Sequence, residues 1–359
     1  MINVLKPKFR TDEVMSEIRE CLERGWTGLG WKTKEFEQAW IDYTNLSHAH
    51  FINSATSGLH LALNIFKKRY KWKDGDEVIT TPLTFVSTNH VILYERLKPV
   101  FADVDEFLCL DPNDIINKIT PRTKAVIFVG LGGNAGRLDK ISNICKQKGI
   151  KLILDAAHMA GTYTNEKLNK SRHVGYQADA TVFSFQAVKN LPTSDSGMIC
   201  FKDKEDDRLA RQLSWLGIDK DTYSRFSHGS YKWKYDVPNI GFKYHGNALT
   251  AAIGLVQLKY LDEDNNRRRE IAQIYSDALN DVDYVQIIGS SSYTAKNAQH
   301  LFQISVPKSI RDKMLNSLYK DEIYPGVHYI DNTQYDPYKY AYGSCPFAHA
   351  ASDQLITLP

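Results

Sequence analysis

Short apolar runs alternate with longer amphipathic stretches along most of the chain. The runs are rich in β-branched and aromatic residues and are bounded by turn residues, which predicts buried strands. They lie at residues 77–80, 99–104, 125–129, 151–154 and 180–185. Strands that alternate with helices at this spacing form a mostly parallel α/β sheet, and polar side chains at their carboxyl ends meet at one edge of that sheet.

Helical periodicity predicts the elements beside these strands. Thr11 is expected to cap a helix over residues 11–23, and a second helix follows over about 34–43. A short strand, a turn of small residues and a helix occupy residues 50–69. The apolar spacing of a further helix begins only after Arg137.

The pattern changes in the last third of the chain. One long helical stretch is predicted over residues 248–279, and strand-like and helical pieces follow from 301 to 329. We therefore expect a large domain over residues 1–260 and a smaller α+β C-terminal domain over 261–359. The abrupt end at Pro359 suggests that the natural chain continues.

Composition narrows the class of protein. The chain has 359 residues, 43% hydrophobic and 24% charged, which is enough for a sizeable globular core. The formal net charge is +3, and the basic clusters at 67–73 and 267–269 are short, so solvated helix faces explain them better than nucleic acid binding does. No stretch approaches the ~18 apolar residues of a membrane span, and the N-terminus lacks a signal-peptide core. The five cysteines, never spaced as CxxC, indicate free thiols and no zinc site, so we expect a cytoplasmic protein.

Lys189 is a lone lysine just beyond the predicted buried strand at 180–185. Burial disfavours the ammonium form and lowers the pKa of a lysine, which leaves an amine free to attack a carbonyl and form a Schiff base. The alternative is an ordinary lysine on a solvated loop. The choice between the two depends on the rest of the chain.

Thr56 and Ser57 open the helix that follows the turn at 53–55. The N-terminus of a helix presents unpaired amides to an anion, so a phosphate is able to bind there with the two hydroxyls as further donors. The alternative is a pair of capping residues that only starts the helix.

Residues 130–135 fit the pattern G-x-G-x-x-A directly after a predicted strand, and Asp155 follows some twenty residues later, at the end of another strand. This is the fingerprint of dinucleotide binding, with Asp155 holding a ribose. The fingerprint requires a helix that starts on the glycines, whereas the helical spacing begins after Arg137. An NAD-dependent oxidoreductase therefore stays as an alternative.

Asp155 and His158 form the second group of candidate residues. A carboxylate at the end of a buried strand is costly unless it meets a cation. Opposite the nitrogen of a pyridine ring, Asp155 would keep that nitrogen protonated and make the ring an electron sink. The structural alternatives are a helix cap for Asp155 and a satisfied core histidine for His158.

Taken together, these stretches resemble the DegT-type sugar aminotransferases, a pyridoxal phosphate-dependent group with the aspartate aminotransferase (type I) fold. The resemblance covers nearly the whole chain. It is carried, in the family's order and approximate spacing, by residues 53–60, 74–79, 99–105, 155–158, 183–191 and 251–258. It implies a mostly parallel sheet in a large domain, a smaller C-terminal domain, and pyridoxal 5'-phosphate as cofactor.

The resemblance also implies roles for individual residues. Lys189 matches the lysine that bonds to the cofactor and then carries the proton between substrate and cofactor. Asp155 matches the partner of the ring nitrogen, His158 the neighbour of the ring hydroxyl, and Phe85 the residue stacked on the ring. The phosphate ligands correspond to Thr56, Ser57 and Ser184, with Lys243 reaching the phosphate from the second subunit of a homodimer with shared active sites.

The implied reaction moves an amino group from glutamate to a keto group of a nucleotide-linked deoxy sugar, in the biosynthesis of amino sugars such as those of lipopolysaccharide. The related 3-dehydratases carry histidine in place of Lys189, which favours amino transfer. Trp26, Thr27, Gly28, His328 and Tyr329 are candidate substrate contacts. Two further alternatives stay open: a small phosphorylated ketone as acceptor, and a regulator that binds the cofactor without turnover.

Some positions depart from the family's pattern. Gly130 replaces a common histidine, Gly246 stands where a methionine is frequent, and the segment 194–197 reads Ser-Asp-Ser-Gly in place of Gly-Glu-Gly-Gly. These differences put the identity of the substrate in doubt more than that of the cofactor.

Overall fold

A mixed sheet forms the centre of the computed structural model, which describes residues 1–165, 171–219 and 235–359. In these residues its seven strands follow the order β2-β10-β9-β6-β5-β3-β4. Their bounds are β2 (His50–Ile52), β3 (Glu77–Thr80), β4 (Lys98–Phe101), β5 (Thr123–Val129), β6 (Lys151–Asp155), β9 (Ala180–Ser184) and β10 (Gly197–Phe201). Strand β10 runs antiparallel to both of its neighbours, and the pairs from β9 to β4 are all parallel. The predicted α/β fold with a mostly parallel sheet is confirmed.

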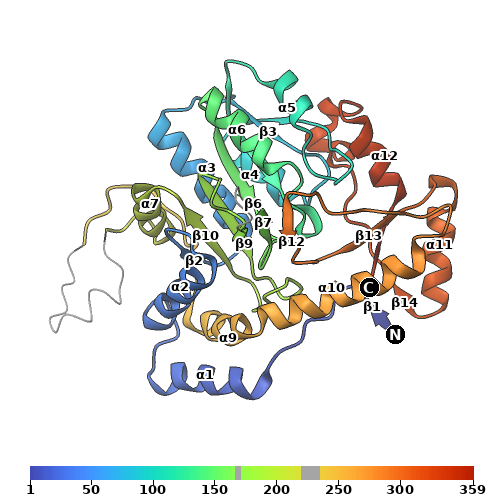
Figure 1. Ribbon diagram of the computed structural model, residues 1–359. Helices are drawn as coiled ribbons and strands as arrows, with labels where there is room; N and C mark the ends of the chain where they lie inside the picture. Colours follow the sequence, from blue (N-terminus) through green and yellow to red (C-terminus); the bar gives the residue numbers. More distant parts are fainter. Residues whose placement is uncertain (166–170, 220–234) are drawn as a thin grey trace.

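Helices cover both faces of the central sheet (Figure 1). On one face lie α3 (Ala55–Tyr70), α4 (Ser87–Tyr94) and α7 (Lys204–Ser214), and on the other α2 (Trp31–Thr44) and α6 (Leu138–Lys148). In β6 the side chain of Ile153 packs against the helices of the first face, while Leu152 and Leu154 pack against those of the second face. Strands buried on both faces read as continuous apolar runs, which is why the sequence revealed them so clearly.

Gly58 allows α3 to lie close against the sheet. A Cβ at this position would come within 2.5 Å of Ile52 Cδ1 and 2.8 Å of Val182 Cγ1. We expect Gly58→Ala to lower the free energy of unfolding by about 1–3 kcal/mol, because the helix must move away from the strands. Urea denaturation measures the change. Gly289→Ala is the control, since nothing lies within 4 Å of its added Cβ, and equal stability of the two variants would contradict this packing.

The predicted cap of the first helix is wrong. Helix α1 spans Thr11–Glu23, but Arg10 occupies the cap position and no side chain caps the helix. The guanidinium of Arg10 instead donates to both oxygens of Asp264, at 2.6 and 2.8 Å. A contact between residues so far apart in the chain fixes where the helix begins, and no local pattern reveals it.

The long helix predicted over residues 248–279 is two helices, α9 (Ala248–Lys259) and α10 (Leu261–Leu279). Tyr260 separates them, and its hydroxyl donates a hydrogen bond to Glu13 of α1. The domain boundary expected between 260 and 261 coincides with this junction and stays a prediction. In Figure 1, α10 runs from the sheet region to the C-terminal part.

The C-terminal part contains a small antiparallel sheet of β11 (Gln286–Ile287), β13 (Phe302–Ser305) and β15 (Leu355–Leu358). Helix α11 (Lys308–Lys320) packs against this sheet, and α12 (Pro346–Gln354) leads into β15. Strand β1 (Ile2–Asn3) pairs with β14 (Ile323–Tyr324). The N-terminus and the C-terminus lie near each other (Figure 1). Strand β12 (Thr294–Lys296) pairs with β7 (Tyr163–Asn165), which in turn pairs with β8 (Ser171–His173).

The remaining described elements are short. They are α5 (Pro112–Lys118) and the 3-10 helices η1 (Leu131–Gly133), η2 (Asn332–Gln334) and η3 (Asp336–Ala341). Over the residues described, no helix combines the length and apolar character needed to cross a membrane. All five cysteines are buried free thiols.

Candidate active site

A cavity of about 480 Å³ opens at the carboxyl ends of β6 and β9. The N-terminus of α3 and two segments of the C-terminal part complete its wall. The predicted site residues among its lining are Thr56, Phe85, Asp155, His158, Ser184, Lys189, His328 and Tyr329. Side chains from widely separated positions therefore meet where the ends of parallel strands were expected to place them.

Lys189 lies in the turn after β9, and its amide donates to the carbonyl of Gln186 at 2.8 Å. The next residue fixes this turn, because the Asn190 side chain donates to Asn265 Oδ1 at 2.7 Å and to the carbonyl of Ala298 at 2.8 Å. Burial lowers the pKa of Lys189 to about 8, and the charge of Asp155 opposes the shift only in part. The lysine is thus held in the cavity and carries a much larger fraction of neutral amine near pH 7 than an ordinary lysine.

Asp155 is the last residue of β6 and only 5% exposed. Its Oδ2 accepts a hydrogen bond from Thr88 Oγ1 at 2.7 Å, and its Oδ1 accepts one from the amide of Ala157 at 3.2 Å. Burial raises the pKa of this carboxyl, and the Thr88 hydrogen bond acts against the rise. Among the residues described, no cation forms an ion pair with it. A buried carboxylate without a counter-ion is costly, and a cationic ring nitrogen in the cavity would relieve that cost.

His158 stands three residues beyond Asp155. Its Nδ1 accepts a hydrogen bond from the amide of Gly132 at 3.2 Å, which leaves the proton on Nε2, 3.3 Å from the hydroxyl of Tyr329. Burial and the nearby charge of Lys189 lower the pKa of His158 well below its usual range. The imidazole is therefore neutral at physiological pH and offers one N–H to the cavity.

His300 also lines the cavity, although no sequence pattern singles it out. Its ring lies 4.3 Å from the ring of His158, and burial lowers its pKa well below the usual range. A lone histidine just before a strand is far more often a core residue than a functional one, so only the spatial neighbourhood identifies it.

The N-terminus of α3 forms the anion-binding end of the cavity. Ser54 caps the helix by accepting from the amide of Ser57 at 3.1 Å. The Ser57 hydroxyl donates to Asn53 Oδ1 at 2.7 Å, and Ser57 does not line the cavity. Ala55 and Thr56 do line it, and no described residue accepts from their amides. These first-turn amides are the ones a phosphate would use.

Phe85 is an exposed aromatic side chain at the cavity. It is 59% exposed, and its ring centroid lies 6.2 Å from that of Tyr329. An aromatic ring left open to the cavity suits the face of an aromatic cofactor.

Besides Ser57, four predicted residues lie outside this cavity. Trp26, Thr27 and Gly28 belong to the loop between α1 and α2, where the amide of Ala248 donates to the carbonyls of Thr27 and Gly28 at 3.0 and 3.1 Å. Lys243 places its Nζ 3.5 Å from the ring centroid of Trp215. Within one chain, none of the four joins the cavity lining.

Two of the unusual glycines are explained by packing. A Cβ at Gly130 would lie 2.0 Å from Met159 Sδ, and one at Gly246 would lie 2.2 Å from Phe51 Cδ1. Larger neighbours therefore occupy the space of the missing side chains, and both glycines follow from the local core of this chain.

A comparison with protein families matches residues 9–359 to the DegT/DnrJ/EryC1/StrS aminotransferase family. The chain belongs to this family. One relative is the spore coat polysaccharide biosynthesis protein SpsC of Bacillus subtilis (strain 168). This chain is 38% identical to SpsC over 356 residues, and the alignment covers 96% of this chain and 88% of SpsC.

Solved structures agree with this assignment. Helicobacter pylori PseC, an aminotransferase involved in the biosynthesis of pseudoaminic acid, superimposes with a TM-score of 0.89 at 27% identity, over 100% of this chain and 93% of that one. The PLP-form of Spr1654 from Streptococcus pneumoniae gives a TM-score of 0.88 at 26% identity, over 99% and 92%. The aminotransferase thus has the type I fold and uses pyridoxal phosphate.

The residues present in the cavity fit this cofactor. They offer an amine with a lowered pKa, a buried carboxylate that forms no ion pair with the described residues, open amides at a helix N-terminus and an exposed aromatic ring. When bound, the cofactor supplies the electron sink for the carbanion that forms during amino transfer.

The NAD-dependent alternative is wrong. The glycines of the fingerprint form the 3-10 helix η1, and α6 begins only at Leu138, so no helix N-terminus faces a dinucleotide there. The amide of Gly132 is directed to His158 instead. The family match makes the chain an aminotransferase, which also overturns the alternative of a regulator without turnover.

Thr88 was not singled out by the sequence, although it positions Asp155. We expect Thr88→Val to weaken binding of pyridoxal phosphate by about 10- to 100-fold, the effect of losing one hydrogen bond to a buried charge. The reason is that the pKa of Asp155 rises further when the bond is lost, so its carboxylate is ionised less often. Equilibrium titration with the cofactor measures the effect. Thr88→Ser keeps the hydroxyl and should bind normally; equal weakening in both variants would contradict this role.

Proposed function

We propose that the enzyme transfers an amino group from glutamate to a keto group of a nucleotide-linked 4-keto-6-deoxy or 3-keto sugar. The observation that carries the proposal is the pairing of a lysine with a lowered pKa and a buried, unpaired carboxylate in one cavity. SpsC is a spore coat polysaccharide biosynthesis protein and PseC an aminotransferase involved in pseudoaminic acid biosynthesis, and both likenesses support a sugar as acceptor. A small phosphorylated ketone is the second candidate acceptor.

In this proposal each residue of the cavity has a separate role. Lys189 would hold the cofactor through its Nζ and would then carry the proton during amino transfer. Asp155 would favour the protonated form of the ring nitrogen, and Phe85 would pack against the ring. His158 donates its Nε2 proton toward the cavity.

The proposed phosphate site lies at the start of α3. The amides of Ala55 and Thr56 and the hydroxyls of Thr56 and Ser184 would hold the phosphate. Ser57 supports the phosphate site indirectly. Its hydroxyl hydrogen-bonds to Asn53 and to the carbonyl of Ser54 and thereby stabilises the turn before α3. His328 and Tyr329, which also line the cavity, contact the substrate.

We further propose a homodimer in which each chain completes the other's site. Lys243 would then reach the phosphate of the partner, and Trp26, Thr27 and Gly28 would face the partner's substrate. Large apolar side chains that a second copy could cover support this, since Ile240 is 89% and Val237 52% exposed. A reducing cytoplasm suits the five buried free thiols, and a role in amino-sugar biosynthesis follows from the proposed acceptor.

The test is the visible absorbance of the purified enzyme with pyridoxal phosphate, before and after glutamate, followed by addition of a keto sugar nucleotide. We expect glutamate to bleach the band of lysine-bound cofactor and the sugar nucleotide to restore it. A band that glutamate leaves unchanged would reject glutamate as the donor. Recovery with a small phosphorylated ketone, but not with the sugar nucleotide, would reject the proposed acceptor.

A further inference from the structure

A second groove, of about 290 Å³, lies next to the cofactor cavity. The segment between β1 and α1 and the start of α10 form its sides. Three residues, Leu5, Val188 and His300, line both the groove and the cavity, so the two spaces adjoin beside Lys189. Four basic residues line the groove, namely Lys6, Lys8, Arg267 and Arg268.

Most of this positive charge has no partner in the described part of the chain. Arg267 donates to Glu270 at 2.8 Å, but no ion pair or side-chain hydrogen bond involves Lys6, Lys8 or Arg268 in the described residues. The acid of the groove, Asp264, gives both of its oxygens to Arg10. The groove therefore carries an excess of positive charge.

Arg268 is the most informative of the four. It is partly buried, and burial lowers its pKa while the charge of Asp264 opposes the shift. The interpretation of residues 267–269 as a solvated helix face does not hold for it. A guanidinium that loses water without gaining a counter-ion is costly, and an oxyanion in the groove would compensate for that cost through two parallel hydrogen bonds.

We propose that this groove binds the diphosphate group of the acceptor, with Arg268 as its central contact, while the keto group of the sugar reaches Lys189. The inference rests on the nucleotide-linked acceptor proposed above. The charge of the groove favours a diphosphate over the donor. A diphosphate concentrates about two negative charges in one group, whereas the two carboxylates of glutamate lie at opposite ends of its carbon chain and each carries one. The groove and the cavity share Leu5, Val188 and His300 in their linings, which places a ligand bound in the groove beside the segment that carries Lys189.

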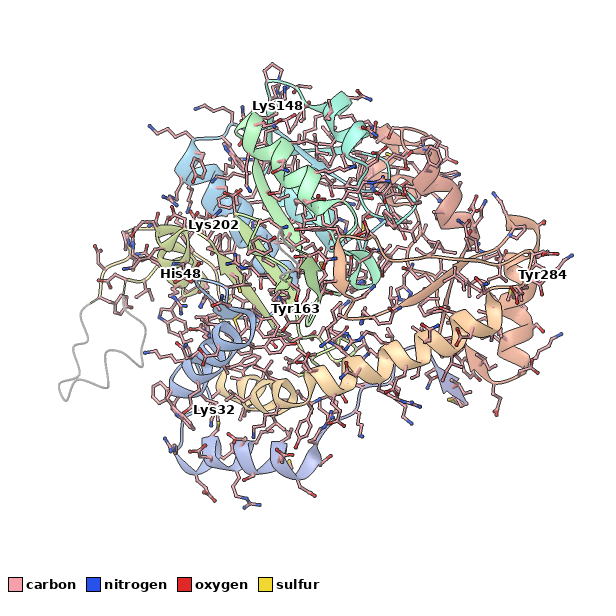
Figure 2. The ribbon with its side chains drawn as sticks, viewed as in Figure 1. Lys32, His48, Lys148, Tyr163, Lys202 and Tyr284 are labelled. Carbon is pink, nitrogen blue, oxygen red and sulfur yellow. The ribbon has the colours of Figure 1, made fainter. Side chains whose placement is uncertain are left out.

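Calorimetric titration of the pyridoxal phosphate-loaded enzyme with inorganic pyrophosphate at low salt tests the inference. We expect saturable binding that Arg268→Gln weakens by about 10- to 100-fold, as for a lost charge-assisted hydrogen bond. Lys148→Gln removes the same charge from an exposed site at the far end of α6 (Figure 2) and should leave binding unchanged. A double variant, Lys6→Gln with Lys8→Gln, alters two exposed side chains and should weaken binding even if Arg268→Gln fails to fold.

The outcomes that overturn the inference are distinct. Absence of binding to the wild type, or equal loss in the groove and Lys148 variants, would show that no site exists. Displacement of pyrophosphate by glutarate, which has the donor's two carboxylates but no amine, would assign the groove to the donor. The titration measures binding and needs no turnover. If pyrophosphate does not bind, the spectral test of amino transfer can still succeed, and if amino transfer fails, the titration can still show binding.

Discussion

Replacing Lys189 with alanine is expected to lower kcat/KM for amino transfer by about 10⁴-fold or more. The variant loses both the nucleophile that bonds to the cofactor and the group that moves the proton, and general acid–base catalysis alone contributes about 10²- to 10⁴-fold. Steady-state kinetics measure the loss, and the visible band of lysine-bound cofactor should be absent. Lys189 contributes no ion pair in the described residues, so we expect the fold to persist.

Lys148→Ala is the matched control. This exposed lysine, labelled in Figure 2, ends α6 just before the start of β6, whereas the cavity lies at the carboxyl end of β6. It should keep full activity and the visible band. If Lys189→Ala retained more than about a hundredth of the wild-type activity, its role in proton transfer would be wrong.

The lowered pKa of Lys189 adds a pH dependence to this prediction. Its ordinary value is about 10.4, and burial lowers it to about 8, so the neutral amine becomes the main form above pH 8. The rate at which the cofactor-free enzyme develops the visible band should therefore rise about tenfold per pH unit below 8 and level off above it. A rate that continued to rise through pH 10 would show a solvated, unshifted lysine.

Asp155→Asn carries the second largest expected effect, a loss of about 10²- to 10³-fold in kcat. Asparagine keeps the shape of the side chain but removes the negative charge that stabilises a proton on the ring nitrogen. The cofactor should still attach to Lys189, so the visible band should remain while amino transfer fails. Stopped-flow absorbance after adding glutamate separates attachment from turnover.

The control for this change is Asp283→Asn. This exposed carboxylate makes no ion pair or side-chain hydrogen bond with the described residues and does not line the cavity. It should transfer amino groups at the wild-type rate. Normal transfer by Asp155→Asn would instead mean that Asp155 only caps the segment after β6 through Ala157.

The strongest local patterns predicted the fold and the centre of the site. Strands buried on both faces gave continuous apolar runs, so β5, β6 and β9 were recognisable without any knowledge of their neighbours. Asp155 and Lys189 stood out because charged residues at the ends of such runs are unusual. The topology of parallel sheets then places their ends together, and the cavity at β6 and β9 agrees with that expectation.

Other features depend on contacts that no local pattern contains. Arg10 in place of Thr11 at the start of α1, the break at Tyr260, and the glycine loop directed to His158 all follow from partners far away in the chain. The same holds for Thr88, His300 and Arg268. Each has an ordinary sequence context, and its proposed role can be inferred only from the side chains that lie beside it in the structure.

The sequence by itself thus determined the α/β sheet, the family resemblance, and the lysine and carboxylate of the cavity, because burial periodicity and unusual charges are local signals. Only the tertiary structure decided the lowered pKa of Lys189, the hydroxyl that positions Asp155, and the unpaired cations next to the cavity. Desolvation and hydrogen bonding depend on the distances between side chains, and those distances are fixed only when distant segments pack together.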